Sequence, residues 1–285
     1  MSRVFYAAHS VSVDGGTVAG AQSVAMNTTF NLEPVFQLGS LEPIDILSLS
    51  PQVEATVTRA IVGGSIISGS FSDWACSAGG HSVSIGISDD CSPILGGGGS
   101  GMNISDAGIS GATWTFTNEG IFTEEVTFTG SSKGVIASSL VAPISAQQTG
   151  AGVEFRPHFQ GVNIAGGVLG GLLASVTVSA SIGREQLFAL GQYSAVANYA
   201  GTPAEITYEI ETYATSAGDS TPIAEADYGC GSSTSVFPIS VSSCGVTISS
   251  AKAAFAGVSY GGGDTGGGNA TITYTYTAFN DLTIG

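Results

Sequence analysis

Positively charged residues are scarce in this sequence. Only 6 of its 285 residues are Lys or Arg, against 22 Asp or Glu, so the formal net charge is −16. A protein that grips a nucleic-acid backbone needs a basic patch, and the six cations are scattered. The composition therefore argues against stable DNA binding and predicts a protein that repels DNA. The cations are Arg3, Arg59, Lys133, Arg156, Arg184 and Lys252.

Long apolar runs are also missing. The best candidate for a membrane span, residues 166–183, is broken by five glycines and several Ser and Thr residues. A spanning helix needs about 20 apolar residues. The stretch before His9 has too few apolar residues for the core of a signal peptide. We therefore expect no membrane segment, and synthesis in the cytoplasm without export.

Charged residues make up only 10% of the chain, whereas glycine is abundant with 42 residues. Glycine costs about 1 kcal/mol inside a helix, while Val, Ile and Thr favour strands. Alternation of apolar and polar residues recurs in about six short segments of each half, separated by Gly-rich turns. This pattern predicts a mainly all-β protein of sandwich or half-barrel modules, and it allows a short helix in each half, at 33–48 and 184–197. The expected strands are 8–13, 23–30, 53–62, 82–87, 112–117, 123–129, 160–164, 173–181, 204–213, 235–241, 253–260 and 269–277.

The two halves share an ordered set of matches about 150 residues apart, which indicates internal duplication. Two tandem modules are predicted, 1–145 and 146–285, with the boundary in the Ser-, Ala- and Gln-rich stretch 138–152. The alternative is generic similarity between Gly- and Thr-rich β-proteins, but composition alone does not keep the cysteines in step. The matches are Gly15-Gly16 with Gly166-Gly167, Phe36 with Phe188, Leu38-Gly39 with Leu190-Gly191, Pro51 with Pro203, Cys76 with Cys230, Cys91 with Cys244, and 103–116 with 247–260.

Four cysteines are present, and their similar spacing in the two halves favours bonds within each module. The expected pairs are Cys76 with Cys91 and Cys230 with Cys244. Buried free thiols are the alternative, because the cytoplasm keeps thiols reduced, whereas a particle released from a cell meets an oxidising environment. No C-x-x-C motif or nearby His suggests a zinc site.

No catalytic constellation is recognisable. The stretches 59–64 and 217–221 hint at a trypsin-like protease, but Ser220 is followed by Thr221 and Pro222, where such an enzyme needs a glycine beside its oxyanion hole. The glycine runs 96–101 and 261–268 lack the Lys and Ser/Thr that end a phosphate loop. We expect no enzyme activity, no cofactor and no metal.

Two stretches of the first half carry distinctive motifs. The stretch "VFQLGSLEPIDILSLSPQVEATVTRAIVGG" (35–64) has an F-x-L-G-x-L-E opening, a proline and a V-x-x-T-V strand. The stretch "GISGATWTFTNEGIFTEEVTFTGSSKG" (108–134) has a late aromatic strand, G-x-F-T-E and V-T-x-x-G. With these motifs the chain resembles virion structural proteins of tailed bacteriophages, in particular the major tail tube family. The second half keeps these motifs only through the repeat, with Gln192 in place of Ser40 and no G-x-F-T-E.

The resemblance implies β-sandwich modules whose inner sheets join around a ring, with rings stacked into a conduit for the ejected genome. A ring of six modules needs three copies of a duplicated chain, a pseudo-hexameric homotrimer, and six copies with two stacked modules remain open. The implied partners are the chain itself, other tail proteins and passing DNA that is not bound specifically. The implied location is the virion tail, assembled in the host cytoplasm.

A negative lumen would let DNA slide without sticking. The candidate lumen residues lie on strand-like segments, and Glu124 or Glu125 is favoured without choosing between these neighbours, because adjacent strand residues face opposite sides. Solubilising charges on an outer face are the alternative. The candidates are Glu124, Glu125, Glu205, Glu209 and Glu211.

A binding module is the alternative function: a phage fibre or receptor-binding protein, or a capsid decoration protein. Such proteins also use duplicated β-sandwiches and Gly-rich loops. Four tyrosines in the second half would serve as a glycan-binding cluster in that case, although core packing is the commoner use of Tyr on strands. They are Tyr193, Tyr199, Tyr208 and Tyr213.

Overall fold

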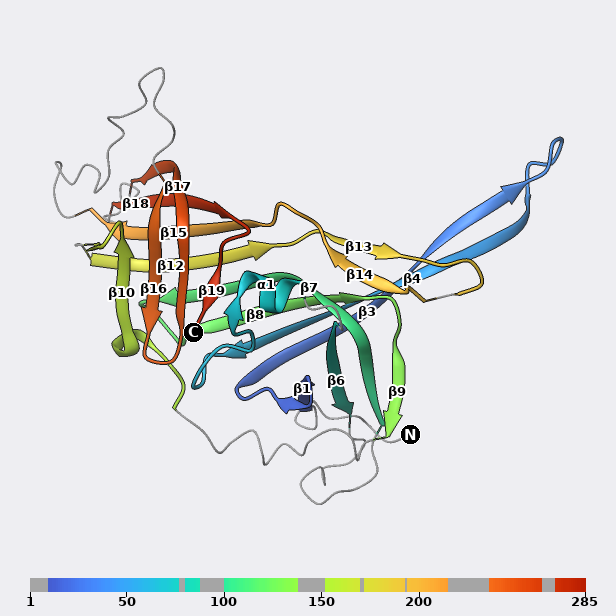
Figure 1. The fold of residues 1–285 in the computed structure, drawn as a ribbon, viewed down its shortest axis with the longest axis horizontal. Coiled ribbons are helices and arrows are strands. Elements are labelled where there is room, and N and C mark those ends of the chain that lie inside the picture. The colour runs from blue at the N-terminus through green and yellow to red at the C-terminus, as the bar shows by residue number, and fades with distance from the viewer. Residues whose placement is uncertain are drawn as a thin grey trace.

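The protein is all-β, as the alternation predicts. The computed structural model describes residues 10–76, 80–87, 100–137, 152–169, 172–192, 194–214, 236–262 and 270–285, and within them the only α-helix is α1 (Phe71–Ala75). Each of the twelve expected strands overlaps a strand of the structure. The strands form long antiparallel ribbons that bend from one sheet into another (Figure 1).

The main sheet of the first half has the strand order β3-β4-β8-β7. Its strands alternate between buried apolar and exposed polar residues, as in Val53 to Thr58 of β4, so one face packs on a core and the other faces outward. β3 and β4 form a hairpin, and β8 lies between β4 and the C-terminal part of β7. The bounds are β3 (Ala21–Phe36), β4 (Pro43–Ala60), β8 (Thr123–Gly130) and β7 (Ser100–Thr117).

The second half contains a sheet with the same pairing order, β12-β15-β18-β17. Irregular pairings fall at matching places: Ala21/Ser23 of β3 corresponds to Leu173/Ser175 of β12, and Ile109/Gly111 of β7 to Phe255/Gly257 of β17. The two sheets therefore share order, register and bulges. The bounds are β12 (Leu172–Ser181), β15 (Glu205–Tyr213), β18 (Thr271–Phe279) and β17 (Thr247–Gly261).

A smaller sheet covers the apolar face of each main sheet. In the first half its order is β2-β1-β6-β7-β9, and in the second β11-β10-β16-β17-β19. β7 and β17 run through both layers, and the core lies between the layers. The bounds are β1 (Ser10–Val13), β2 (Gly16–Thr17), β6 (His81–Ile87), β9 (Gly134–Ala137), β10 (Phe159–Ile164), β11 (Gly167–Val168), β16 (Val236–Ser243) and β19 (Thr283–Ile284).

The layers are in contact through matched aromatic pairs. In the first half the His81 and Phe128 rings meet edge to face with centroids 6.1 Å apart. In the second half Phe237 and Tyr276 occupy the corresponding positions, with centroids 5.8 Å apart. These T-shaped contacts add to apolar burial and tie β6 to β8 and β16 to β18.

The two main sheets are continuous with each other. The C-terminal part of β7 pairs with β12, from Gly111 opposite Ser181 to Thr117 opposite Ser175. This β7–β12 joint produces one run of eight strands, β3-β4-β8-β7-β12-β15-β18-β17. A second contact pairs β19 with β5 (Gly69–Ser70), and isolated bridges join Val62 to Val153 and Ile121 to Phe155.

Long β-hairpins occupy the two stretches in which the sequence allows a short helix. Residues 33–48 belong to the distal part of β3 and β4, and residues 184–197 to the hairpin of β13 (Arg184–Leu187) and β14 (Ala197–Ala200). In their described residues these stretches form strands instead, because main-chain pairing across each hairpin satisfies their backbone groups. Beyond Phe30 the β3–β4 hairpin projects from the body as an arm, at the upper right of Figure 1.

The helix α1 begins after Ser70, in a place that the sequence pattern did not indicate. The Asp73 carboxylate accepts hydrogen bonds from the Ser70 backbone N–H (2.8 Å) and from the Ser70 hydroxyl (2.6 Å). This is the capping arrangement that satisfies free donors at a helix start. The hydroxyl hydrogen bond, followed by the backbone one, lowers the pKa of Asp73.

Candidate functional site

The outward face of the eight-strand run is polar and acidic, and we call it the polar face. It consists of alternate residues, mostly Thr, Ser or Glu and all exposed or half-buried. None of these side chains is a Lys or an Arg. The segments, taken at every second residue, are Ser23–Thr29, Gln52–Thr58, Thr123–Thr127, Gly111–Thr117, Ser175–Ser181, Glu205–Glu211, Thr271–Thr277 and Gly257–Gly261.

Alternation in the sequence produces this face, because residues two apart on a strand point the same way. In β15 the exposed or half-buried residues Glu205, Glu209 and Glu211 alternate with the buried residues Ile206, Tyr208 and Ile210. Within the described strands, neighbours on either side of β15 extend the pattern, since Glu209 lies opposite Thr177 of β12 and Thr275 of β18.

Hydroxyl groups flank the carboxylates of the polar face. The Thr58 hydroxyl donates to Glu125 Oε2 at 3.1 Å, and the Ser175 hydroxyl donates to Glu211 Oε2 at 2.9 Å. Glu205 and Glu209 are exposed. Four of the five expected glutamates therefore share one face of the sheet and keep contact with solvent.

Glu54 is a fifth carboxylate of this face, and sequence reasoning missed it. It is exposed on β4, opposite Asn27 of β3. The signal was present, because Glu54 alternates with the apolar residues Val53, Ala55 and Val57.

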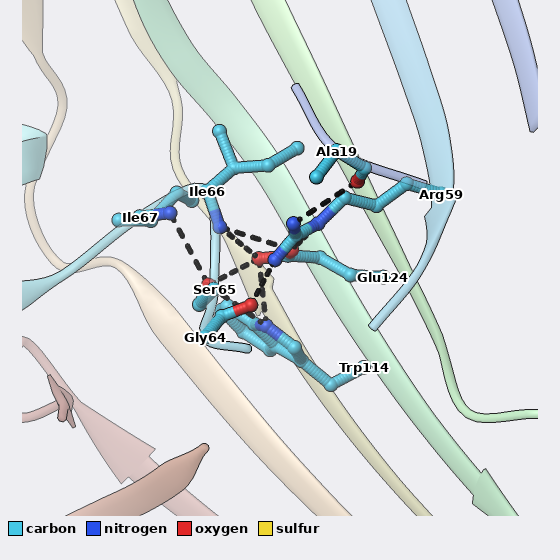
Figure 2. Close-up of polar contacts among 8 residues, drawn as sticks. All are labelled: Ala19, Arg59, Gly64, Ser65, Ile66, Ile67, Trp114 and Glu124. Carbon is cyan, nitrogen blue, oxygen red and sulfur yellow. Dashed lines mark hydrogen bonds and ion pairs between the residues drawn. The ribbon is translucent and has the colours of Figure 1, made fainter. Parts of the chain in front are cut away.

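Glu124 points to the opposite side and is completely buried, with 0% of its surface exposed. Figure 2 shows it at the centre of a polar cluster. Arg59 Nε lies 2.6 Å from Glu124 Oε2, the Ile66 backbone N–H donates to the same oxygen at 3.0 Å, and Trp114 Nε1 donates to Oε1 at 3.0 Å. The Ser65 hydroxyl also donates to Oε1. Glu124 therefore lies in the protein interior as the partner of Arg59, which corrects its expected place on a lumen surface.

Arg59 completes this buried cluster. Its Nη1 donates to the Ala19 carbonyl at 3.3 Å and its Nη2 donates to the Gly64 carbonyl. The pair thus fastens the loop after β4 to the sheet (Figure 2). A buried charge is tolerated only when it is paired and hydrogen-bonded, and both members meet that condition.

The free edges of the eight-strand run are its second notable feature. In the described part of the chain, β3 pairs only with β4, and Gly257–Gly261 of β17 pairs only with β18. The residue Tyr260 on this edge of β17 is 63% exposed, whereas Trp114, at the matching position of β7, is 0% exposed beneath the β7–β12 joint. Unpaired strand edges are templates for pairing with another chain.

The cysteine pairs stay predictions. Cys76 and Cys244 are exposed, and their expected partners Cys91 and Cys230 lie outside the described residues.

The tyrosines of the alternative glycan-binding cluster differ in their surroundings. Tyr208 is fully buried, which raises its pKa, whereas Tyr199 is exposed, and Tyr193 lies outside the described residues.

Among the described residues, no three His, Cys, Asp or Glu side chains gather as metal ligands would. No helix in the same ranges has the length and apolar character to cross a membrane.

Comparison with known proteins finds similarity in structure but not in sequence. No family model and no curated protein matches the chain. Among solved structures, the chain is similar to the tube-terminating cap of the anti-feeding prophage, with a TM-score of 0.38 and 10% sequence identity. That alignment covers 48% of this chain and 92% of the cap. A likeness at this level carries no argument about function.

Proposed function

We propose that this protein is the tail tube subunit of a tailed bacteriophage. Three copies would close into a pseudo-hexameric ring, and stacked rings would form a conduit for DNA ejection. The observation that carries the proposal is the continuous eight-strand sheet, which among the described residues has an acidic face free of cations and two unpaired edges. The family resemblance of residues 35–64 and 108–134 agrees with it.

The likeness of the two main sheets supports the symmetry of this assembly. The sheets β3-β4-β8-β7 and β12-β15-β18-β17 share order and bulge positions, and the β7–β12 joint connects them head to tail. A head-to-tail contact generates a ring when its rotation closes. The same contact, repeated between the free β17 and β3 edges, would join one chain to the next.

The width of the closed sheet favours three copies over two. Strands lie about 4.8 Å apart and tilt by about 40° in barrels. Three copies with eight strands each would then enclose a backbone diameter of about 48 Å, and two copies about 32 Å. Side chains take roughly 5 Å on each side, half the spacing of packed sheets. Three copies leave an open bore about 38 Å wide, which is enough for a hydrated DNA duplex of about 20 Å. The bore of two copies would have almost no clearance around the duplex.

The polar face suits the lining of such a conduit. Its carboxylates, Glu54, Glu125, Glu205, Glu209 and Glu211, repel phosphate, and its Thr and Ser hydroxyls offer only weak neutral contacts. Because no Lys or Arg interrupts the face, no fixed charge would hold the DNA backbone. Passage without binding follows from this chemistry, and no catalytic group is needed.

Electron microscopy of the purified, concentrated protein tests the proposal. We expect hollow rings or tubes with a bore wider than duplex DNA and three chains per ring, counted by native mass spectrometry. Solid rods or dispersed monomers would overturn the conduit and favour a fibre or capsid decoration protein instead.

A further inference from the structure

We propose that a second copy of this chain pairs the β17 edge with the β3 edge in one defined register, with Ser259 of one copy opposite Asn27 of the other. The inference rests on the proposed function, because it names the contact that would close the ring. It specifies which residues meet, and it follows from the β7–β12 joint inside the chain.

Matching rows of paired residues establish the register. In the first half one row runs Ala25–Thr56–Thr127–Gly111. In the second half the corresponding row runs Thr177–Glu209–Thr275–Gly257. Ala25 therefore corresponds to Thr177, and Gly111 to Gly257.

The residue pairs of the β7–β12 joint can then be applied to the two free edges. The joint places Thr113 opposite Ser179 and Trp114 opposite Val178. The matching residues on the free edges are Ser259 with Asn27, and Tyr260 with Met26. The same shift places Gly257 opposite Thr29.

Side chains on the free β3 and β17 edges are more exposed than their counterparts in the β7–β12 joint, as expected if a second chain covers them. Val178 of β12 is buried within the joint, whereas Met26 at the matching position of β3 is only half-buried. Tyr260 is exposed on the other edge. A second copy would cover both side chains on the core side of the sheet, as Trp114 and Val178 cover each other inside the chain.

Both edges lack the charged residues and prolines that commonly protect edge strands. Such edges usually carry charged residues, particularly Lys, or Pro. Neither Ala21–Thr29 of β3 nor Ala253–Gly261 of β17 contains a charged residue or a proline. Their composition therefore permits pairing with another chain.

A second contact lies beside the β7–β12 joint, where the β13–β14 hairpin packs on the first half; we call this contact the clasp. Inside the chain the β13–β14 hairpin lies against the first half: Arg184 Nε and Nη2 donate to the Ile109 carbonyl at 2.8 and 2.6 Å, and Asn198 Nδ2 donates to the Thr129 carbonyl at 2.8 Å. On the arm, the strand pairings place Leu32 and Ile46 at the positions of Arg184 and Asn198.

The clasp between copies would thus be apolar. Leu32 and Ile46 are 63% and 55% exposed. The counterparts of Ile109 and Thr129 on the next copy are Phe255 and Thr277. Phe279 lies two residues beyond Thr277 at the end of β18 and is 57% exposed. The polar clasp inside the chain uses carbonyl acceptors, whereas the clasp between copies would cover the exposed Phe279 ring.

A cysteine pair tests the register. The variant Asn27→Cys with Ser259→Cys places two thiols opposite each other, where Cα atoms of paired strands lie about 4.5–5.5 Å apart, within the range of a disulfide. The control Ala25→Cys with Ser259→Cys keeps the same face but moves the thiols to a diagonal of about 7–8 Å. All three positions are exposed, and the unmodified chain provides the background from its own cysteines.

After mild oxidation, we expect covalent dimers and trimers from the in-register pair, at least about tenfold above the control on non-reducing gels. Rings that form without this crosslink, or with equal crosslinking in the control, would overturn the register and leave the tube function standing. Crosslinked trimers that never stack into hollow tubes would support the register and overturn the conduit. Failure of both rings and crosslinks would overturn both.

A charge placed in the clasp gives an independent test. Leu32→Asp with Ile46→Asp should convert rings to single chains in analytical ultracentrifugation at micromolar concentration. The matched control, Leu38→Asp at the fully exposed tip of the arm, should keep the rings. Intact rings in the Leu32/Ile46 variant would contradict the apolar clasp.

Discussion

Arg59 and Glu124 form a buried ion pair in the core of the first half, with Arg59 Nε 2.6 Å from Glu124 Oε2. The next residue, Glu125, is exposed on the other face of the same strand. Two adjacent glutamates thus have opposite surroundings, and they form a matched pair for measurement.

Glu124→Ala should lower the free energy of unfolding by about 3–5 kcal/mol, because it leaves the Arg59 guanidinium buried without its partner. Glu125→Ala should change it by no more than about 0.5 kcal/mol, as for most surface substitutions. Chemical denaturation of both variants under one buffer measures the difference. Equal losses would show that Glu124 is not the anchor that Figure 2 indicates.

Stability should fall at high pH because two buried tyrosines resist ionisation. Burial raises the pKa of Tyr276 to about 12 and raises the pKa of Tyr208 further, against about 10 in an unfolded chain. The folded state therefore holds these protons more tightly. The contribution is fully present below pH 10 and is lost as pH rises from about 10 toward 12. Denaturation midpoints measured from pH 8 to 11.5 should show this decline.

Tyr208→Phe provides the control for that pH dependence. The Ser250 hydroxyl donates to the Asp281 carbonyl, so the Tyr208 hydroxyl donates to Ser250 Oγ at 2.6 Å. The variant should lose about 1 kcal/mol at neutral pH with this hydrogen bond, but it should lose less stability than the parent between pH 10 and 11.5. An unchanged slope would indicate that Tyr208 does not hold its proton more tightly in the folded state.

Reversing the charge of the polar face should create DNA binding in assembled tubes. Glu205→Lys, Glu209→Lys and Glu211→Lys together place three cations on β15, and cations on phosphate supply salt-dependent affinity. We expect retention of labelled duplex DNA at about 50 mM salt and a loss of at least about 10³-fold in affinity by about 200 mM. The triple Gln variant should retain no DNA. Binding by the unmodified tubes would contradict a repelling lumen.

The tip of the arm should govern stacking more than ring closure. Leu38 and Leu41 are fully exposed there, and covering one such side chain contributes about 1.5–3 kcal/mol. Leu38→Asp with Leu41→Asp should leave rings intact but shorten the tubes seen by electron microscopy severalfold. Leu190→Asp, on the shorter β13–β14 hairpin, is the matched comparison. Tubes of normal length would assign stacking to another surface.

The strands could be predicted from sequence because their apolar alternation is local. The same alternation places Glu205, Glu209 and Glu211 on one face, as in the structure. It cannot distinguish Glu124 from Glu125, because the choice depends on Arg59, a residue from a distant strand. The arm escaped prediction for a related reason. Both of its faces carry exposed apolar residues, such as Leu32 and Leu47, so no one-sided pattern marks its strands.

The internal duplication stays a prediction, and the strand pairings give another correspondence between β7 and β17 than the sequence matches do. Matching residues 103–116 to 247–260 places Trp114 on Val258, whereas the strand pairings place it on Tyr260. The difference of two residues preserves which side chains face the core, since strand periodicity is two. Only the pairing with β8 and β18 decides between the two alignments.

The β7–β12 joint also changes the cost of assembly. Two modules on one chain meet at an effective concentration set by their tether, which for short tethers reaches the millimolar range. Every second contact of a six-module ring would thus form during folding, whatever the protein concentration in the cell. Two encounters between chains would then complete a ring that six separate modules would need five encounters to build, and nucleation would depend on a lower power of concentration. The contact within the chain and the contact between chains involve different residues, so their sequences can diverge. The clasp within the chain can therefore be polar while the clasp between chains is apolar.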